Sequence, residues 1–320
     1  MKLKVLELFG GIGACSKAIE KLGIDYEIAD YVEIDKYAVK SFNAMHNTNF
    51  EPQDICEWDK DIKVDLIMHG SPCQDFSLAG KQAGGDKDSG TRSSLMYETI
   101  RIVEKLKPKY VIWENVKNLL SKKHRHNFDA YLETMEQLGY TNYYQVLNAK
   151  DYGIPQNRER VFTVSIRDDS NYNHCTLGNP DDLDLDWEVY NFKFPPKQEL
   201  KLKLKDMLED EVDEKYYLSD VQIKRIETTT YNVGKTRIQK KEWCDTLCAR
   251  DWKDPKCVEV NRIRKLTPKE CWRLMGFDDV DFEKASKVNS NTQLYKQAGN
   301  SIVVNVLEAI LNNLLPTCKN

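Results

Sequence analysis

Three kinds of polar side chain that can take part in chemistry follow apolar runs of the sequence. Cys73, in GSPCQDFS, comes shortly after the apolar run 64–68, and Glu114, in VIWENV, ends the next apolar run. Arg158 and Arg160, in QNRERVF, stand two residues apart, so an extended chain places both guanidinium groups on one face. A thiolate is a nucleophile, a carboxyl group can move a proton, and arginines can hold an oxygen that gains charge. Such groups would be costly as mere packing, so we expect them to converge on one crevice.

Two interpretations of Cys73 are open from its position alone. It is either a small buried residue or a nucleophile that is presented to a ligand. A free cysteine has a pKa of about 8.5 and needs help to ionise at neutral pH. No histidine partner is evident, because His69 is expected to be structural. The glycine-rich segment 74–93 is suited to a loop that closes over a ligand.

A glycine-rich turn, LELFGGIGACS, separates the first apolar run from an amphipathic segment. Glycines at such a turn let the backbone approach a nucleotide, and Glu33, at the end of the next run, is placed to accept ribose hydroxyls. Asp54, near the end of the third strand-like run, is placed to reach an adenine amino group, with Ile55 over the ring. The pattern is shared by dinucleotide enzymes and methyltransferases. A plain turn that requires glycine, with a solvated Asp54, explains it equally well.

The elements that must position these residues alternate between strands and helices as far as residue 167. The pattern predicts strands over 3–9, 26–32, 64–68, 110–113, 143–147 and 160–166, and helices over 14–22, 36–45, 95–106 and 128–138. This alternation predicts an α/β fold with a doubly wound, mostly parallel sheet. Ligands bind such sheets outside the carboxyl ends of the strands, which is where the polar residues stand.

The regular pattern ends near residue 167 and returns late in the chain. We expect residues 1–167, completed by 295–320, to form a catalytic and cofactor-binding domain. Residues 168–294 are expected to form a second, smaller and irregular domain with a connecting arm. The apolar side chains of 303–314 share one face of a final helix, which should pack back on the first domain.

The connecting arm contains a readable helix start in TPKECWRLMGF. Thr267 is the expected N-cap, Pro268 the first helical residue and Glu270 the capping-box partner, while Gly276 ends the helix. We expect this arm to be structural and to brace the smaller domain.

Composition limits the classes of protein that this chain can represent. It has 320 residues, of which 41% are hydrophobic, so a sizeable core is expected. The chain contains no apolar stretch of about eighteen residues, so no membrane span is predicted, and its start shows no signal-peptide cleavage site. Nine scattered cysteines fit reduced cytoplasmic thiols. Cysteines 244, 248, 257 and 271 lack the close pairs typical of zinc sites, so no metal site is predicted.

The net charge of −4 hides a strong asymmetry along the chain. Residues 168–214 carry 14 acidic and 5 basic side chains, a balance of −9. Residues 215–273 carry 15 basic and 8 acidic side chains, a balance of +7. A locally basic surface that meets phosphates is one interpretation, and two ordinary solvated faces is the other.

Together these residues resemble the DNA cytosine-5 methyltransferase family of the bacterial and phage restriction-modification type. The motifs that carry the resemblance are ELFGGIGA, EID, QDI, GSPCQDFS, WENVKN, QNRERVF, RKLTPKECWRLMGF and QAGNSI, in the family's order. They cover roughly residues 5–166 and 261–310, and CDTLCARD resembles an element of the family's target recognition region less specifically.

The resemblance implies a Rossmann-like class I fold, S-adenosylmethionine as cofactor, and a defined chemistry. Cys73 would add to carbon 6 of a cytosine that is flipped out of the duplex, so that carbon 5 can accept a methyl group. Glu114 would share a proton with ring nitrogen 3, and Arg160, with Arg158, would hold the base oxygen.

The resemblance also implies two sets of binding residues. The cofactor site would contain Phe9, Gly11, Gly13, Glu33, Ile34, Asp54, Ile55, Pro72, Leu95 and Asn300. DNA contacts are expected from Gln74, Ser77, Arg237, Thr246, Arg250, Lys253 and Lys256.

We therefore expect a monomeric cytoplasmic enzyme that acts on double-stranded DNA, with no membrane partner and with a cognate restriction endonuclease as a candidate partner. A cytosine-5 methyltransferase that acts on transfer RNA is the alternative within the family. A dinucleotide oxidoreductase would explain the glycine turn and Glu33 but leaves Cys73, Glu114 and the arginines without roles. A DNA-binding regulator without cofactor is disfavoured, because the catalytic set is intact.

Overall fold

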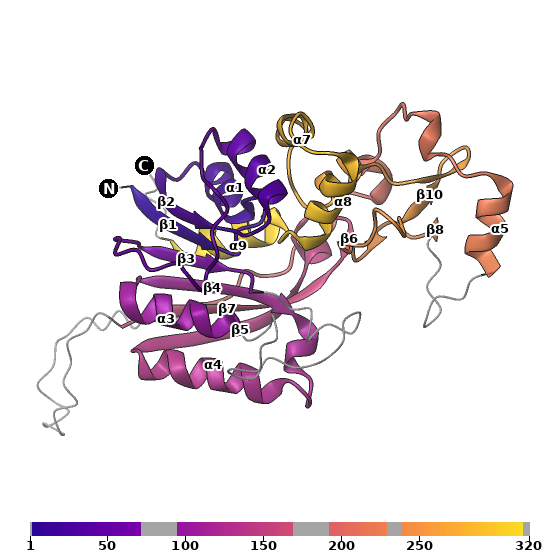
Figure 1. Ribbon diagram of the computed structural model, residues 1–320. Helices are drawn as coiled ribbons and strands as arrows, with labels where there is room; N and C mark the ends of the chain where they lie inside the picture. Colours follow the sequence, from indigo (N-terminus) through magenta and orange to yellow (C-terminus); the bar gives the residue numbers. More distant parts are fainter. Residues whose placement is uncertain (1, 72–94, 169–191, 229–237, 316–320) are drawn as a thin grey trace, which may run out of the picture.

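A computed structural model describes residues 2–71, 95–168, 192–228 and 238–315. Its centre is a six-stranded sheet in the order β2-β1-β3-β4-β7-β5 (Figure 1). The strands are β1 (Leu3–Leu8), β2 (Tyr26–Val32), β3 (Leu66–His69), β4 (Tyr110–Val116), β5 (Tyr140–Asn148) and β7 (Glu159–Arg167). Strands β2, β1, β3 and β4 are parallel, and β7 runs antiparallel to both of its neighbours. The expected mostly parallel sheet is confirmed.

Helices cover both faces of this sheet, as the twofold period of strand side chains requires. Val5, Leu66 and Ile112 pack in one core cluster with apolar side chains of α1 (Ala14–Lys21) and α9 (Val304–Leu314). The alternate strand positions pack in a second cluster with α3 (Met96–Leu106) and α4 (Arg125–Gln137). Helix α2 (Lys36–His46) stacks Phe42 on Tyr31 of β2. The final helix, α9, therefore packs on the same face of the sheet as α1, as expected from its apolar face.

Several element boundaries differ from the sequence-based expectations, and three of the differences bear on the site or its helices. Strand β4 extends to Val116, so Glu114 lies inside a strand that is hydrogen-bonded to β7, and not after its end. Helix α4 begins at Arg125, three residues before the predicted start. The prediction that Asp54 lies near the end of a strand is wrong. Residues 51–54 are irregular and lead into a turn, and Gln53 attaches them to the end of β2 by its N–H to the Glu33 carbonyl (2.9 Å) and by its side-chain amide to the Tyr31 carbonyl (2.7 Å).

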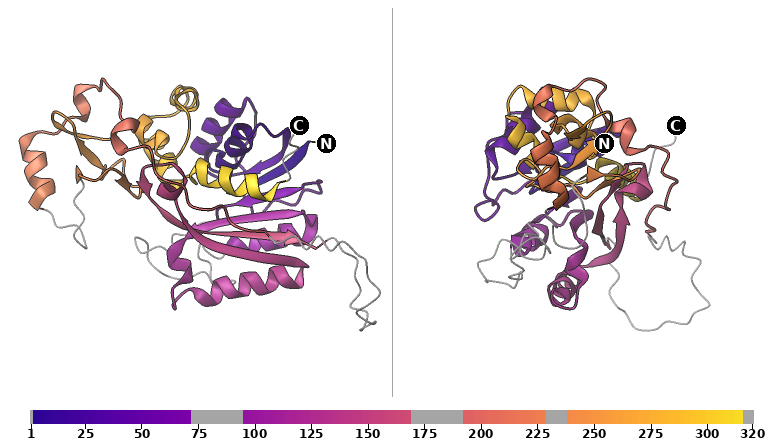
Figure 2. Two further views of the ribbon diagram at one scale, coloured as in Figure 1. Left: turned by 180° about the vertical axis from the view of Figure 1, so that it is seen from behind. Right: turned by 90° about the vertical axis from the view of Figure 1, so that its right-hand side faces the viewer.

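The region between the sheet and its closing helix is built from short elements (Figures 1 and 2). Its described helices and strands are η4 (Leu204–Met207), η5 (Glu214–Tyr216), α5 (Asp220–Thr228), β8 (Ile238–Gln239), β9 (Cys244–Asp245), β10 (Cys257–Glu259) and β11 (Ile263–Lys265). Strands β11, β10 and β8 form a small sheet. Strand β9 pairs with β6 (Gln156–Asn157), which follows η3 (Ala149–Tyr152) of the main domain. Another short helix, η2 (Lys117–Leu120), follows β4.

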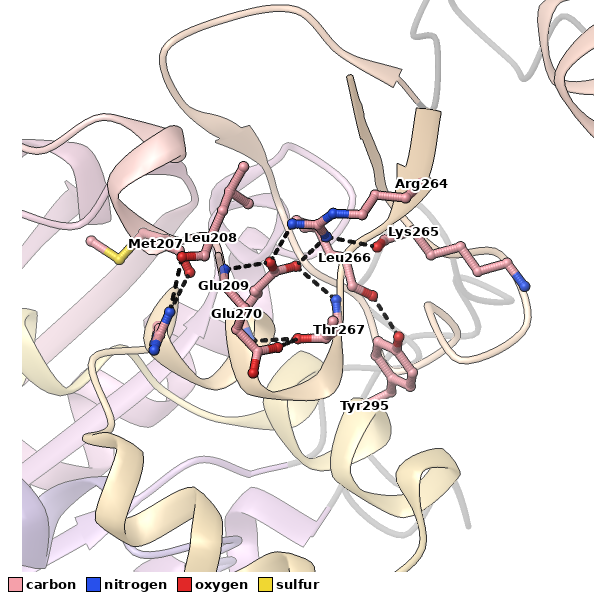
Figure 3. Close-up of polar contacts among 10 residues, drawn as sticks. Met207, Leu208, Glu209, Arg264, Lys265, Leu266, Thr267, Glu270 and Tyr295 are labelled. Atoms are coloured by element: carbon pink, nitrogen blue, oxygen red, sulfur yellow. Dashed lines mark hydrogen bonds and ion pairs between the residues drawn. The ribbon is translucent and has the colours of Figure 1, made fainter. Parts of the chain in front are cut away.

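The connecting arm contains α6 (Pro268–Arg273), α7 (Asp279–Ser286) and α8 (Asn291–Asn300). Helix α6 has the predicted capping box, in which Thr267 Oγ1 accepts from Glu270 N–H and the Glu270 carboxylate accepts from Thr267 N–H. The same carboxylate accepts hydrogen bonds from both terminal nitrogens of Arg264 (2.9 and 2.7 Å) and from the N–H of Glu209 (2.9 Å), as Figure 3 shows. Arg264 and Glu270 are almost fully buried, so an ion pair is the centre of this arm.

Candidate active site

A cavity lies at the carboxyl ends of β1, β3 and β4, where the winding of the sheet reverses direction. It encloses about 410 Å³, part of which is open to solvent. Its described lining includes backbone from the glycine turn, Gly70 after β3, Glu114 of β4, and the segment before α9; the residues are Glu7, Leu8, Phe9, Gly10, Gly11, Ala14, Cys15, Met68, Gly70, Glu114, Asn300, Ser301 and Ile302. The predicted residues Phe9, Gly11, Glu114 and Asn300 therefore meet in one place.

The glycine turn that forms one wall has an unusual backbone. Phe9, Gly11 and Gly13 have φ of 53°, 56° and 78°, in the left-handed region that favours glycine. A Cβ on Gly13 would come within 2.7 Å of the Phe42 ring and of His46 Nε2, so no other residue fits. The turn can therefore pass close to α2 and direct the Gly11 N–H toward β2.

Glu33 holds this turn from the neighbouring strand. Its Oε2 accepts from Gly11 N–H (3.0 Å) and its Oε1 accepts from Asp35 N–H (2.8 Å). Burial raises the pKa of the Glu33 carboxyl, while the two backbone donors lower it. The next residue, Ile34, is 67% exposed, which is unusual for a large apolar side chain in a fold with this much core. A carboxylate beside an uncovered apolar side chain suits a ribose and a flat ring.

Three further residues of the expected cofactor set have different environments. Asp54 is exposed, and its carboxylate accepts from Cys56 N–H (2.9 Å). Ile55 is only 4% exposed and packs in the core cluster of Trp58 and Leu8, so its side chain supports the loop. Leu95 precedes α3 and packs against that same cluster.

Glu114 is the buried carboxyl group of the cavity. Burial raises the pKa of this carboxyl, and the nearby Arg160 and Arg158 lower it. Its Oε1 lies 3.0 Å from Arg160 Nε, and a side chain added at Gly70 would lie 4.0 Å from its Oε2. The free edge of the carboxyl thus faces the start of the segment that leads to Cys73.

Arg158 and Arg160 line a further small cavity together with Glu114, as expected of a shared crevice, but their hydrogen bonds differ. Arg160 is partly exposed and pairs with Glu114. Arg158 is 4% exposed, and its terminal nitrogens donate to the carbonyls of Leu247 (2.9 Å), Gly299 (3.3 Å) and Ser301 (2.8 Å). This geometry favours Arg160 as the group for a base oxygen and Arg158 as a brace between distant segments.

Gln156 and Gly299 complete that brace, and sequence reasoning gave neither of them a role. Gln156 Oε1 accepts from Leu247 N–H (3.0 Å), so Gln156 and Arg158 hold both backbone groups of Leu247. A Cβ on Gly299 would come within 2.1 Å of the Cys248 carbonyl carbon, so α8 and residues 247–249 are in direct backbone contact. Only the motifs QNRERVF and QAGNSI could have pointed to this junction, because its contacts join residues far apart in sequence.

Glu7 is a second buried carboxyl that the sequence reading passed over. Its Oε1 accepts from Ser16 N–H (3.0 Å) and from the Ser16 hydroxyl (2.5 Å) at the start of α1. Burial raises the pKa of Glu7, and the hydrogen bonds from Ser16 lower it. An acidic residue inside the apolar run LELFG was the signal that could have identified it.

The expected DNA-contacting residues divide into two groups. Arg250 and Lys253 are exposed, as a phosphate contact requires. Thr246 donates its hydroxyl to the Asn157 carbonyl (2.7 Å), and Lys256 is mostly buried at 3.8 Å from Asp251. The latter two therefore support the region's own structure. Five expected site residues lie outside the described residues: Pro72, Cys73, Gln74, Ser77 and Arg237.

Other groups in the described residues have structural environments. His69 is fully buried against Trp113, and burial lowers its pKa to about 3, so this imidazole is neutral. Among the described residues, no three or more His, Cys, Asp or Glu side chains are grouped to hold a metal ion. Within the same part of the chain, no helix is long and apolar enough to cross a membrane.

Comparison with known proteins gives a consistent result over almost the whole chain. The family model of C-5 cytosine-specific DNA methylase matches residues 3–315. The type II methyltransferase M2.ScrFI of Lactococcus lactis subsp. cremoris is 35% identical over 98% of this chain and 99% of its own length. The orphan methyltransferase M.SPBetaI of Bacillus phage SPbeta is 32% identical over 100% of this chain and 99% of its own.

Solved structures show the same fold. The S. pombe Dnmt2 methyltransferase has a TM-score of 0.69 at 21% identity and covers 98% of this chain and 99% of its own. The Entamoeba histolytica methyltransferase EhMeth has a TM-score of 0.74 at 16% identity, with the same coverage.

Proposed function

The chain belongs to the family of C-5 cytosine-specific DNA methylases, and on that premise we propose that it methylates cytosine within a specific sequence of double-stranded DNA. The reaction would proceed through a covalent adduct between Cys73 and the base. The observation that carries this proposal is the pair formed by the buried Glu114 and the partly exposed Arg160, in which Glu114 lines the cavity beside Gly70, at the start of the segment leading to Cys73.

The cavity residues fit S-adenosylmethionine as the cofactor. When bound, this cofactor would supply an electrophilic methyl group on a positively charged sulfonium. Glu7, a buried carboxyl, lines the cavity, and a nearby cation would favour its ionised form. Glu33 would hold the ribose, and the exposed Ile34 would cover the adenine ring. Phe9, Gly11 and Asn300 would complete the wall.

Cys73 would start the reaction by adding its thiolate to carbon 6 of cytosine. The new carbon–sulfur bond pushes electron density to carbon 5, which becomes the nucleophile for the methyl group. Loss of the carbon 5 proton then restores the double bond and expels the thiolate. The cysteine is regenerated, so the thiolate acts as a covalent catalyst.

Glu114 and Arg160 would make carbon 6 electrophilic enough for that attack. A carboxyl whose pKa is raised by burial keeps its proton to a higher pH, and so can share it with ring nitrogen 3. Arg160 would then hold the base oxygen and offset the negative charge that develops on the ring. Arg158, with its guanidinium bound to three carbonyls, would fix the position of the segment that carries Arg160.

The recognition of DNA is assigned to the irregular part of the chain. We infer that residues 168–294 choose the target sequence and that 1–167 with 295–320 perform the chemistry. Because the reacting atoms are hidden inside a duplex, the base must be extruded into the cavity. The relatives of the type II class make a cognate restriction endonuclease a natural partner. We further infer a monomer that works in the cytoplasm, where genomic DNA is accessible.

Double-stranded DNA is favoured over transfer RNA as the substrate. The matching family model and the two relatives above are described as DNA methylase or as type II or orphan methyltransferases. The likeness to Dnmt2 is a likeness of fold and does not bear on the substrate.

The test is bisulfite sequencing of genomic DNA from a methylation-free host that expresses the wild-type protein. We expect protected cytosines in one short sequence context, and none when Cys73→Ala is expressed at the same level. Unprotected DNA from a host whose purified protein folds and binds S-adenosylmethionine would overturn the proposal, and transfer RNA would be assayed next.

A further inference from the structure

Trp252 stands apart from the other tryptophans in the described part of the chain. Trp58, Trp113 and Trp272 are at most 3% exposed, and Trp243 is partly covered. Trp252 is 49% exposed. A large aromatic side chain in water gives up the free energy that its burial would provide, so an uncovered tryptophan at a fixed position indicates a surface that something else covers.

The backbone around Trp252 is held firmly, although its side chain is open. Asp251, 5% exposed, accepts from Cys248 N–H through Oδ2 (3.0 Å), and Asp251 N–H donates to the Cys248 carbonyl (2.9 Å). The N–H groups of Lys253 and Asp254 both donate to the Arg250 carbonyl (2.8 and 3.0 Å). Residues 248–254, here called the tryptophan turn, therefore present Trp252 in a preorganised position.

The tryptophan turn is connected to the wall of the active-site cavity through the end of α8. Its first residues touch the backbone of Gly299, and Leu247, which precedes it, is bound by Arg158 and Gln156. Asn300, the neighbour of Gly299, lines the cavity together with Glu114. The turn and the cavity that would receive the cytosine are therefore fixed to neighbouring residues of α8.

The charges on either side of Trp252 suit a nucleic acid. Arg250 has a side chain that is 76% exposed, and Lys253 is exposed too. The two acidic residues of the turn are less exposed than these cations. Asp254 lies 3.5 Å from Arg250, and Asp251 is buried near Lys256. An aromatic side chain between exposed cations is the arrangement that stacks on bases while the cations meet phosphates.

We propose that Trp252 contacts DNA by stacking on the bases beside the extruded cytosine, which stabilises the opened duplex. This inference rests on the proposed function and adds to it a residue that was not among the expected DNA contacts. Extrusion costs the free energy of unstacking the base, and an aromatic surface placed next to the gap offsets part of that cost.

The test measures binding of fluorescently labelled duplexes that carry the site mapped by bisulfite sequencing, in the presence of S-adenosylhomocysteine. We expect Trp252→Ala to weaken binding about tenfold and Trp252→Phe to retain most of the affinity, because each stacked base contributes of this order. The salt dependence should stay unchanged, since stacking releases no counterions. Lys253→Ala should instead lower the salt slope by about one.

Two controls make the test specific. Val260→Ala removes another exposed apolar side chain of the same region, 58% exposed and next to Glu259, and should bind like the wild type. A duplex of the same length without the mapped site offers no extruded cytosine and no exposed neighbouring bases, so the loss caused by Trp252→Ala should shrink on it.

The inference would be overturned if Trp252→Ala bound both duplexes as tightly as the wild type, or lost equal affinity on both. Each variant is first shown to unfold at the wild-type temperature. Failure of the proposed function would look different, because the wild-type protein itself would then methylate no duplex.

Discussion

The sheet domain and the irregular region use opposite means to hold their residues. In the sheet domain, strands of up to nine residues are covered on both faces by apolar helices, and Glu114 is fixed in the middle of a paired strand. The irregular region has strands of two or three residues, and an ion pair, Arg264–Glu270, is the centre of its arm. With the roles proposed above, the difference suggests that the catalytic residues are held by tight packing of the sheet domain. The proposed recognition region depends instead on a few polar contacts.

Glu114→Gln should have the largest effect, and it should be confined to chemistry. The amide cannot deliver the proton, so we expect kcat to fall by about two to four orders of magnitude, with folding and cofactor binding retained. In the wild type, activity should decline as pH rises through the raised pKa of Glu114, because the protonated form is then lost. Single-turnover rates across pH are the measurement.

A matched control for Glu114→Gln stands on the neighbouring strand. Glu159 is exposed and pairs with Lys117, so Glu159→Gln should leave the rate and its pH profile unchanged. Equal losses from both variants would show that charge near the site matters, and not the proton on Glu114.

Glu270→Gln should have the next largest effect, and it should fall on stability and DNA binding. It leaves the buried Arg264 without its charge partner, which costs about 3–5 kcal/mol in comparable cases. We expect a lower unfolding temperature and weaker DNA binding, with the S-adenosylmethionine affinity of the folded protein little changed. Calorimetric unfolding measures the loss of stability, and titration with a DNA duplex measures the loss of binding. Titration with S-adenosylmethionine checks that the cofactor site is unchanged.

The same region provides an exposed pair for comparison. Glu214 lies 2.7 Å from Arg262 at the surface, and Glu214→Gln should not move the unfolding temperature measurably. If Glu270→Gln were equally silent, the buried ion pair would not be what holds the arm together.

Ile34→Ala should have the smallest effect, on cofactor affinity alone. The side chain is uncovered until a flat ring lies on it, and losing that contact should cost about 1 kcal/mol, or about fivefold in Kd. Isothermal titration with S-adenosylhomocysteine measures this directly. Val280→Ala, an equally exposed apolar residue on α7, is the control, and a matching loss there would remove Ile34 from the cofactor site.

Local pattern was enough to predict some of these features. The order of strands and helices, the capping box of α6 and the apolar face of α9 all depend on residues close in sequence, and the structure has them. The glycine turn could also be predicted, because backbone positions with a positive φ favour glycine and so mark the turn in the sequence.

Contacts between residues far apart in the sequence could not be predicted from local pattern. The spacing of Arg158 and Arg160 suggested a shared face, and both line one cavity with Glu114, but the spacing did not show that Arg158 also binds carbonyls 89 to 143 residues away. Ile55 was itself an expected cofactor residue, yet the loop directs it into the core. No local signal distinguishes an apolar side chain over a ligand from one beneath a loop.

The covalent adduct of Cys73 is the central claim, and a 5-fluorocytosine duplex that carries the mapped site tests it most directly. Fluorine at carbon 5 cannot leave as a proton does, so the adduct cannot break down after methyl transfer. Incubation with S-adenosylmethionine should give a denaturation-resistant protein–DNA complex for the wild type, with the DNA attached at Cys73 by peptide mass spectrometry, and none for Cys73→Ser. A wild-type protein that methylates normal DNA but forms no such complex, or one attached at another residue, would contradict the account.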